Sequence, residues 1–347
     1  MFNVVLFLVS LALVESSSQP ANNDTYALGQ SIYVPETDLL GSVPNGIHLF
    51  SLLQAGCIQN QSLPKSVRNT DYYKDTETLY STIATTTGLQ VNFENDFSFG
   101  FTLDAITHGI SSKNRDVSGS SLQLTEKAYI LLLSKDCLLQ GTPLPQFMED
   151  FHRLNSTIND PWLAESWREY LIFLKKWGSH IITGATQGSS IIQYSFAEET
   201  EKYTERDFAV KSCLSLAGLS DPKEMNLSIC SNITQEETAY VHNLNIKSSL
   251  TVTGGTAKTN IQVVNSRSAE VIERFMREGQ TQPSIIEYTL VPIWEYLQEK
   301  TVGTPDLVKA VNMEYFYNGF LSFDCPYVSQ NNMNLQVFNL TGQAKSE

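Results

Sequence analysis

Apolar and polar residues alternate along several long stretches of this chain. From residue 91 to residue 105 nearly every second position is apolar, and the alternation resumes over residues 122–132. It returns after Gly178, and again over residues 244–252. A period of two over such lengths is typical of long strands with one buried face. The sequence therefore predicts a sheet of long strands.

Segments with helical spacing interrupt these strands. Asp160 and Pro161 form a helix start, with the acidic residue as N-cap and proline at the first helical position. Short strands and tight turns are expected over 26–53, and a strand that runs into a turn or helix over 284–297. The predicted helical segments are 146–154, 161–177, parts of 197–243, and 269–278. Long strands with helical inserts indicate an α+β fold, not the strand–helix alternation of a parallel doubly wound sheet.

Charge narrows the classes of partner. The chain of 347 residues has 23 Lys and Arg against 37 Asp and Glu, a formal net charge of −14. Nucleic acid and anionic lipid are both bound through clusters of basic residues, so we expect no nucleic-acid partner and no simple docking on anionic lipid. Membrane recognition would have to use neutral headgroups, sterol, a glycan or a protein receptor.

The N-terminus indicates secretion. An apolar run over residues 4–14 is followed by serines 16–18, which predicts a signal peptide over 1–17; a buried N-terminal strand or helix is the alternative. Six Asn-x-Ser/Thr sequons support the secretory route and predict N-glycosylation. They are at Asn23, Asn60, Asn155, Asn226, Asn232 and Asn339. We therefore expect an extracellular glycoprotein.

The sequence contains no motif that indicates a catalytic or metal site. The five histidines form no zinc-binding pattern, and no nucleophile elbow, phosphate loop or dinucleotide motif occurs. The five cysteines contain no C-x-x-C pair, and in an oxidising compartment one or two disulfides with at least one thiol left over are expected. His180 is interpreted as a structural histidine bonded to backbone rather than as a catalytic base or metal ligand. We expect no enzyme activity, cofactor or metal.

One segment carries a family resemblance. Tyr170 is followed after six residues by Trp177, Gly178, Ser179 and His180. This resembles the signature of the MACPF (membrane-attack-complex/perforin) family, in which an aromatic residue, Gly, Thr and His follow a Tyr at that distance. Trp177 keeps the ring and Ser179 keeps the hydroxyl group. Residues 251–260 are similar to the family's strand with a Gly-Gly pair, and residues 284–297 to its closing strand.

The resemblance covers about residues 25–300, which would be a MACPF domain, with 301–347 a short C-terminal extension. It implies a bent, twisted four-stranded antiparallel sheet flanked by two helical clusters. In pore-forming members these clusters convert to transmembrane β-hairpins. Carried onto this chain, they would lie at about 103–127, with a polar tip at 111–121, and at about 197–247. The second segment alternates poorly as a strand and holds the sequons at Asn226 and Asn232.

The implied function is that of a secreted pore-forming protein, a cytolysin or defence effector. Such a protein would assemble as a homo-oligomeric ring on a lipid membrane and insert a β-barrel, aided by a protein or glycan receptor where lipid alone is insufficient. The alternative is a non-lytic extracellular MACPF protein in signalling, matrix or egg coat.

Two further expectations come with the resemblance. Relatives carry a cysteine pair in the second cluster, which suggests a disulfide between Cys213 and Cys230, with Cys57, Cys137 and Cys325 as alternatives. Closing a loop of this size stabilises the fold by ~3 kcal/mol in the chain-entropy model. The adjacent Gly254 and Gly255 would be a hinge inside a strand, where the sheet straightens; an ordinary tight turn is the alternative.

Overall fold

The computed structural model describes residues 27–39, 46–52, 56–75, 78–79, 82, 117–161, 163–198, 202–217, 230–321, 336–338 and 344–346. Its strands are β1 Gln30–Ile32, β2 Ile47–His48, β3 Phe50–Leu52, β4 Ile58–Tyr73, β5 Val117–Leu133, β6 Thr142–Pro143, β7 His180–Glu198, β8 Lys247–Thr253, β9 Ser284–Pro292, β10 Gln336–Phe338 and β11 Ala344–Ser346.

The α-helices are α3 Lys135–Gln140, α4 Pro145–Arg153, α5 Arg168–Trp177, α6 Glu205–Ala217, α7 Gln235–His242, α8 Ala257–Asn265, α9 Ala269–Glu278, α10 Ile293–Lys300 and α11 Leu307–Tyr315. Single turns of tighter or wider helix form η1 Val34–Glu36, η3 Ala164–Trp167 and η6 Phe316–Leu321. The α+β fold class is confirmed.

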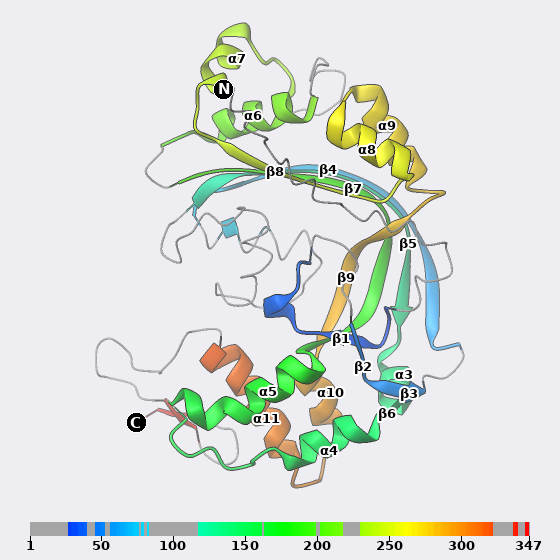
Figure 1. Cartoon of the computed structure of the whole chain (residues 1–347), viewed down its shortest axis with the longest axis vertical. Coiled ribbons are helices and arrows are strands. Elements are labelled where there is room, and N and C mark those ends of the chain that lie inside the picture. The colour runs from blue at the N-terminus through cyan, green and yellow to red at the C-terminus, as the bar shows by residue number, and fades with distance from the viewer. Residues whose placement is uncertain are drawn as a thin grey trace, which may run out of the picture.

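A long bent antiparallel sheet spans the molecule (Figure 1). Its central strand is β7, which pairs with β5 along one edge, and β5 pairs in turn with β4. Along the other edge β7 pairs first with β9 and then with β8, so these two short strands lie end to end as one row. The result is four long rows, as the family resemblance implies, with β1 and β2 added at the lower end.

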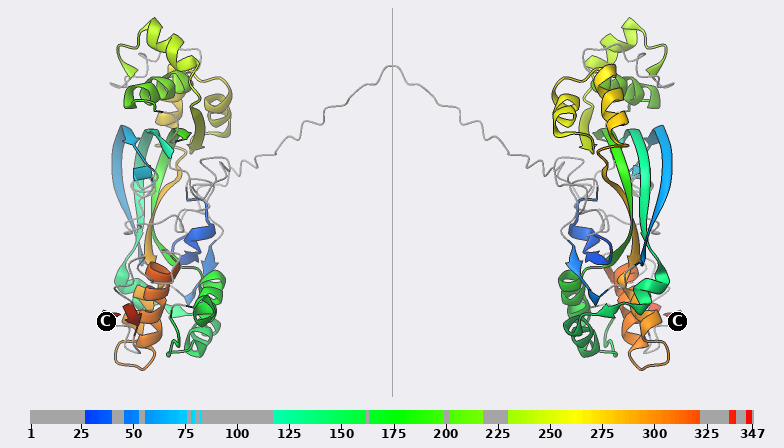
Figure 2. Two further views of the ribbon diagram at one scale, coloured as in Figure 1. Left: turned by 90° about the vertical axis from the view of Figure 1, so that its left-hand side faces the viewer. Right: turned by 90° about the vertical axis from the view of Figure 1, so that its right-hand side faces the viewer.

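Helices cover both ends of this sheet. In Figure 1, α6 and α7 lie above its upper end beside α8 and α9, and α4, α5, α10 and α11 gather at its lower end. Seen edge-on in Figure 2, the molecule is thin, because the sheet is one layer thick over most of its height. The lower helices enclose the larger hydrophobic core, while Leu122, Leu124 and Ile191 pack with α6, α8 and α9 in a second core.

The bend of the sheet coincides with breaks in its register. The β5–β7 register shifts between Lys127 and Tyr129, and the β7–β9 register shifts between Thr186 and Gln187. Extra residues of this kind bend a strand and increase its twist. The Lys127 ammonium on β5 reaches across β7 to Glu287 on β9 at 2.6 Å, with each side chain 16% exposed. This ion pair ties together the two strands that flank β7 at the bend.

The first long strand was not predicted. β4 Ile58–Tyr73 is exposed along most of its length, and within the described part of the chain it pairs only with β5. A strand exposed on both faces needs no alternation of apolar residues, so its sequence has no period of two. Pro64 falls where the β4–β5 register shifts, between Ser62 and Lys65, which is where a strand tolerates proline.

Other boundaries also need correction. The first cluster cannot extend over 103–127, because β5 begins at Val117, so the connection between β4 and β5 is 74–116. The expected polar tip at 111–121 is wrong for its last five residues, which belong to β5. The predicted strand at 91–105 lies outside the described residues. The expected helix at 269–278 is α9, whereas α8 was not foreseen.

The C-terminal part of the chain joins the lower core. Ala310, Met313, Phe316 and Tyr317 are buried together with residues of α5 and α10. Phe316 stacks on Trp167 with 5.4 Å between ring centroids. The packing therefore continues through α11 and η6 without a break at residue 300.

Replacing Glu287 with glutamine keeps the side-chain shape and removes the charge that faces Lys127. We expect the free energy of unfolding to fall by about 1–3 kcal/mol, because the ammonium stays largely shielded from water without its counter-ion. Urea denaturation measures the loss. Glu165→Gln is the matched control, because Glu165 pairs with Arg168 at an exposed site and its loss should not be measurable. Equal losses for the two variants would refute a role of the ion pair at the bend.

Candidate functional site

The signature residues lie where the lower helices meet the central strand. Tyr170 and Trp177 are on α5, Gly178 ends that helix, and Ser179 leads directly into β7 at His180. All five are buried. The structure thus brings the sequence-predicted residues together at one corner of the fold.

Gly178 makes a turn that other residues would not. Its φ of 86° lies in the left-handed region, and its amide donates to the Leu174 carbonyl at 2.8 Å, which closes α5. A Cβ at this position would lie 2.6 Å from Ser31 Oγ on β1. Ser31 Oγ donates to the Trp177 carbonyl. The glycine therefore allows the helix end to approach β1 closely.

Ser179 joins three segments of backbone. Its amide donates to the Ile32 carbonyl at 2.8 Å, and its hydroxyl accepts from the Val34 amide at 3.0 Å. Its carbonyl accepts from the Ile293 amide at 2.9 Å, at the start of α10. These bonds explain why a hydroxyl residue follows the glycine.

The two signature aromatic residues of α5 fasten the helix to its neighbours. The Tyr170 hydroxyl donates to the Asn155 carbonyl at 2.7 Å and accepts from Asn312 Nδ2 at 3.3 Å. Trp177 Nε1 donates to Asp150 Oδ2 on α4 at 2.9 Å. The Lys176 ammonium beside Asp150, at 2.5 Å, holds the pKa of that carboxyl below its usual value. The contacts are structural, with no group placed to attack or protonate a substrate.

His180 is fully buried among aromatic rings. The ring centroids of Trp294 and Tyr317 each lie 5.4 Å from that of His180, in edge-on contact, and Nδ1 lies 2.9 Å from Ser179 Oγ. Burial lowers the pKa of His180 to about 3, because the imidazolium would lose its hydration. The ring is neutral at physiological pH, which agrees with its interpretation as a structural histidine.

The Gly254–Gly255 pair lies at the end of a strand and not inside one. β8 ends at Thr253, the two glycines have φ values of 91° and 66°, and Thr256 caps α8. A Cβ on Gly254 would lie 2.5 Å from the Gly188 carbonyl, and one on Gly255 would lie 2.6 Å from Phe275 Cδ2. The expected position within a strand is therefore wrong, and the geometry is that of a tight turn between β8 and α8. A hinge at this point stays a prediction.

The helical insert between β7 and β8 carries a cross-link. A disulfide joins Cys213 on α6 to Cys230, and a second joins Cys57 to Cys137 on α3, both with 5.6 Å between Cα atoms. Cys325 lies outside the described residues. The sheet meets α6 through small hydroxyl residues: Ser212 Oγ lies 2.7 Å from Ser195 Oγ and 3.2 Å from Ser120 Oγ. This polar contact lies beneath α6, whose bounds the sequence did not predict.

Three of the sequon asparagines are described, and all three are exposed. Asn60 is on β4, Asn155 follows α4, and Asn232 has a φ of 58° just before α7. The sequons at Asn23, Asn226 and Asn339 lie outside the described residues. Exposure leaves the described asparagines accessible to a glycan.

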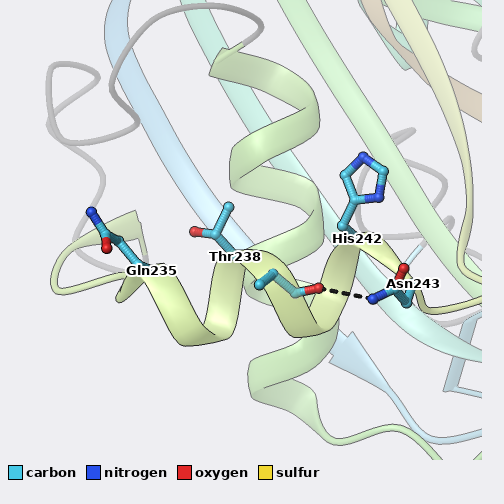
Figure 3. Close-up of a pocket in the computed structure, with 5 residues that line it drawn as sticks. Gln235, Thr238, His242 and Asn243 are labelled. Carbon is cyan, nitrogen blue, oxygen red and sulfur yellow. Dashed lines mark hydrogen bonds between the residues drawn. The ribbon is translucent and has the colours of Figure 1, made fainter.

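The described residues form no metal site but do form a shallow hollow. Within the described ranges, no three or more His, Cys, Asp or Glu residues are close enough together to hold a metal ion. A hollow of about 430 Å³ runs along α7, lined by Gln235, Thr238, Ala239, His242 and Asn243. Their side chains project from successive turns without converging, and Asn243 bonds to the Ala239 carbonyl at 3.2 Å (Figure 3). Of the helices in the described part, none has the length and apolar character needed to cross a bilayer.

Comparison with known proteins decides the family. The model of the MAC/Perforin domain matches residues 54–320. The chain belongs to the MAC/Perforin domain family. Among curated MAC/Perforin relatives it is 32% identical over 331 residues to DELTA-alicitoxin-Pse2b of Phyllodiscus semoni, covering 94% of this chain and 68% of that protein. It is 33% identical over 322 residues to DELTA-thalatoxin-Avl2a of Actineria villosa, covering 92% and 65%.

The chain thus spans about two thirds of the length of these relatives. The MAC/Perforin fold is also that of a solved structure, GNIP1Aa from Chromobacterium piscinae, with a TM-score of 0.59 at 15% identity, over 88% of this chain and 57% of that one. This likeness supports the fold alone. Membership in the MAC/Perforin family, whose toxins are not enzymes, agrees with a site that holds packing contacts and no reactive group.

His180→Gln removes the buried imidazole and tests its protonation state. Above pH 6.5 the His180 ring is neutral in both the folded and the unfolded state, so its titration does not change the free energy of unfolding. Between pH 6.5 and about 3, His180 binds a proton in the unfolded chain but not in the folded protein. The free energy of unfolding therefore falls by up to about 1.4 kcal/mol for each pH unit. The stability advantage of wild type over His180→Gln should therefore shrink as pH falls from 7 to 4. A difference between the two proteins that stays constant with pH would contradict the low pKa.

Gly254→Ala and Gly303→Ala form a matched pair. Both glycines have positive φ, so each substitution carries the same conformational cost of about 1–2 kcal/mol. Gly303 has open space around it, whereas a methyl group at Gly254 meets the Gly188 carbonyl. We expect Gly254→Ala to lose about 1–3 kcal/mol more in urea denaturation. Equal losses would show that the turn is not tightly packed against β7.

Proposed function

We propose that this chain is a secreted pore-forming toxin of the MAC/Perforin family, which oligomerises on a target membrane and inserts a β-barrel. The proposal agrees with the toxin names of both curated relatives, each more than 30% identical over nearly the whole chain. It extends to membrane binding, ring assembly and extracellular localisation, all of which are inferences for this chain.

One observation carries the proposal. β7 and β8 pair in register, and the chain between them is the helical insert that contains α6 and α7. Two antiparallel strands that leave the sheet in register are positioned to continue as a hairpin if the insert becomes extended. Ser212 contacts Ser195 and Ser120 through hydroxyl groups, which can form hydrogen bonds with water once they separate. Separating them therefore costs less free energy than exposing a purely apolar interface.

The partners follow from charge and from the exposed strand. With a net charge of −14, the protein would bind membranes through neutral lipids, sterol, a glycan or a protein receptor. Among the described strands β4 pairs with β5 alone, so its other edge offers backbone groups to which a second copy could add. A homo-oligomeric ring is the assembly that this edge supports.

A second function is favoured by one observation. Asn232 is an exposed sequon residue within the insert, and a glycan there would hinder passage of the insert through a membrane. This favours a non-lytic extracellular MAC/Perforin protein, acting in signalling, matrix or egg coat.

Dye release with a tethered insert separates the two functions. Ser195→Cys with Ser212→Cys replaces two hydroxyls 2.7 Å apart and would cross-link α6 to β7. We expect wild type to release dye from vesicles of phosphatidylcholine, sphingomyelin and cholesterol, and the tethered variant to release none until a reductant is added. The matched control is Thr125→Cys with Ser190→Cys, whose hydroxyls lie 3.0 Å apart within the sheet. That cross-link joins strands that stay paired, so release should persist.

Each other outcome is informative. Vesicle binding by wild type without release supports the non-lytic function. Release by the tethered variant, with the cross-link verified by mass spectrometry, would show that α6 does not leave the sheet.

A further inference from the structure

The disulfide of the insert matches the register of the strands on either side of it. On β7 and β8, Ser190 faces Thr253 and Phe196 faces Lys247, with no shift between them. Each step forward along β7 therefore corresponds to one step back along β8. Seventeen steps forward from Phe196 reach Cys213, and seventeen steps back from Lys247 reach Cys230. The two cysteines occupy facing positions of the same ladder, extended into the insert.

Nothing in the helical arrangement requires this agreement. In the structure, Cys213 is on α6 and Cys230 precedes α7, so the packing of helices decides which residues meet. Their Cα atoms are 5.6 Å apart, and facing residues of an antiparallel pair are separated by about 4.5–5.5 Å. The same cross-link therefore fits the helical insert and a continued ladder.

The extended register also sorts the side chains of the insert by polarity. Among described residues, one face would hold the pairs Val210/Ile233 and Ser212/Ser231, and the other would hold Ala209/Thr234, Lys211/Asn232 and Cys213/Cys230. Within α6 the alternation continues, with Leu214 and Leu216 on the first face and Ser215 and Ala217 on the second. Residues 218–229 lie outside the described part.

This pairing corrects an expectation from the sequence. The segment was expected to alternate poorly, but residues 208–217 alternate between apolar and polar positions when they are placed as a continuation of β7. Strands of about 9–11 residues cross a bilayer, and 208–217 has that length.

We propose that the Cys213–Cys230 disulfide stays closed when the insert converts, and that it fixes the register in which the described residues on either side of it continue β7 and β8 as a transmembrane hairpin. The disulfide lies on the polar, water-facing side of that hairpin, together with Asn232. No covalent bond forms or breaks in the conversion. The inference rests on the proposed pore-forming function.

The physical role of the cross-link follows from the period of a strand. A slip of one residue would move every apolar side chain of one strand to the polar face. A disulfide holds its Cβ atoms about 3.5–4.5 Å apart, a distance that only facing residues satisfy. The closed bond thus excludes slipped pairings before the hairpin reaches lipid.

The first test maps the disulfide in the inserted protein. Wild type is incubated with vesicles of phosphatidylcholine, sphingomyelin and cholesterol until dye is released, and vesicle-bound protein is alkylated and digested without reduction. We expect the peptide pair linked through Cys213 and Cys230, and no rise in release when a reductant is present. Release that requires the reductant, or recovery of both residues as alkylated thiols, overturns the inference and leaves pore formation intact. Absence of release under every condition overturns the proposed function, and this inference with it.

The second test determines which side chains of the proposed hairpin face lipid and which face water. Single cysteines replace Val210 and Leu214 on the apolar face, and Lys211 and Ser215 on the polar face, each in a Cys325→Ser background and labelled with an environment-sensitive dye. On vesicles, the first two labels should report lipid and the last two water. The opposite pattern, or no difference between the pairs, refutes the register.

The third test asks whether the bond sets the register. Cys213→Ser with Cys230→Ser, checked for folding by circular dichroism, should release dye about tenfold more slowly, because the open segment must find its pairing unaided. An unchanged rate would show that the disulfide is compatible with the hairpin without guiding it. The dye labels remain decisive where this variant fails to fold.

Discussion

The hydrogen-bonded pairing of β7 with its neighbours is the constraint on which the remaining architecture depends. A strand of 19 residues has polar backbone groups along both edges, and burial of this strand requires that these groups be paired. β5 meets that requirement on one side, while β8 and β9 share the other. Because two strands are needed to cover one edge, the chain must leave the sheet between them, and α8 and α9 occupy that excursion.

The same constraint explains the corner at the lower end of β7. The signature residues lie where the strand begins, and Ser179 bonds to β1 and to the start of α10 before the ladder takes over at His180. Gly178 gives the helix end the room that this convergence needs. The motif is therefore a means of starting the central strand in the correct place, which accounts for its lack of reactive chemistry.

Sequence reasoning succeeded where burial leaves a periodic trace. α9, β9 and the α+β class could be predicted, since their apolar residues recur with the period of the element that buries them, whereas the signature was found by its resemblance to the MACPF motif. It failed for β4, whose two exposed faces impose no pattern, and for Gly254, since a glycine pair looks the same inside a strand and after one. Under the proposed conversion, the alternation in α6 serves a partner strand, and the β7–β8 register identifies which described residues of the insert would face each other.

The length of α6 has a mechanical consequence. Its 13 residues rise about 1.5 Å each as a helix, so α6 spans about 20 Å. As a strand, the same residues rise about 3.3 Å each and reach about 43 Å. The hydrocarbon layer of a bilayer is about 30 Å thick. Under the proposed conversion, the residues of α6 are too short to cross a membrane as a helix. As a strand they are long enough to cross it, even when the strand is tilted.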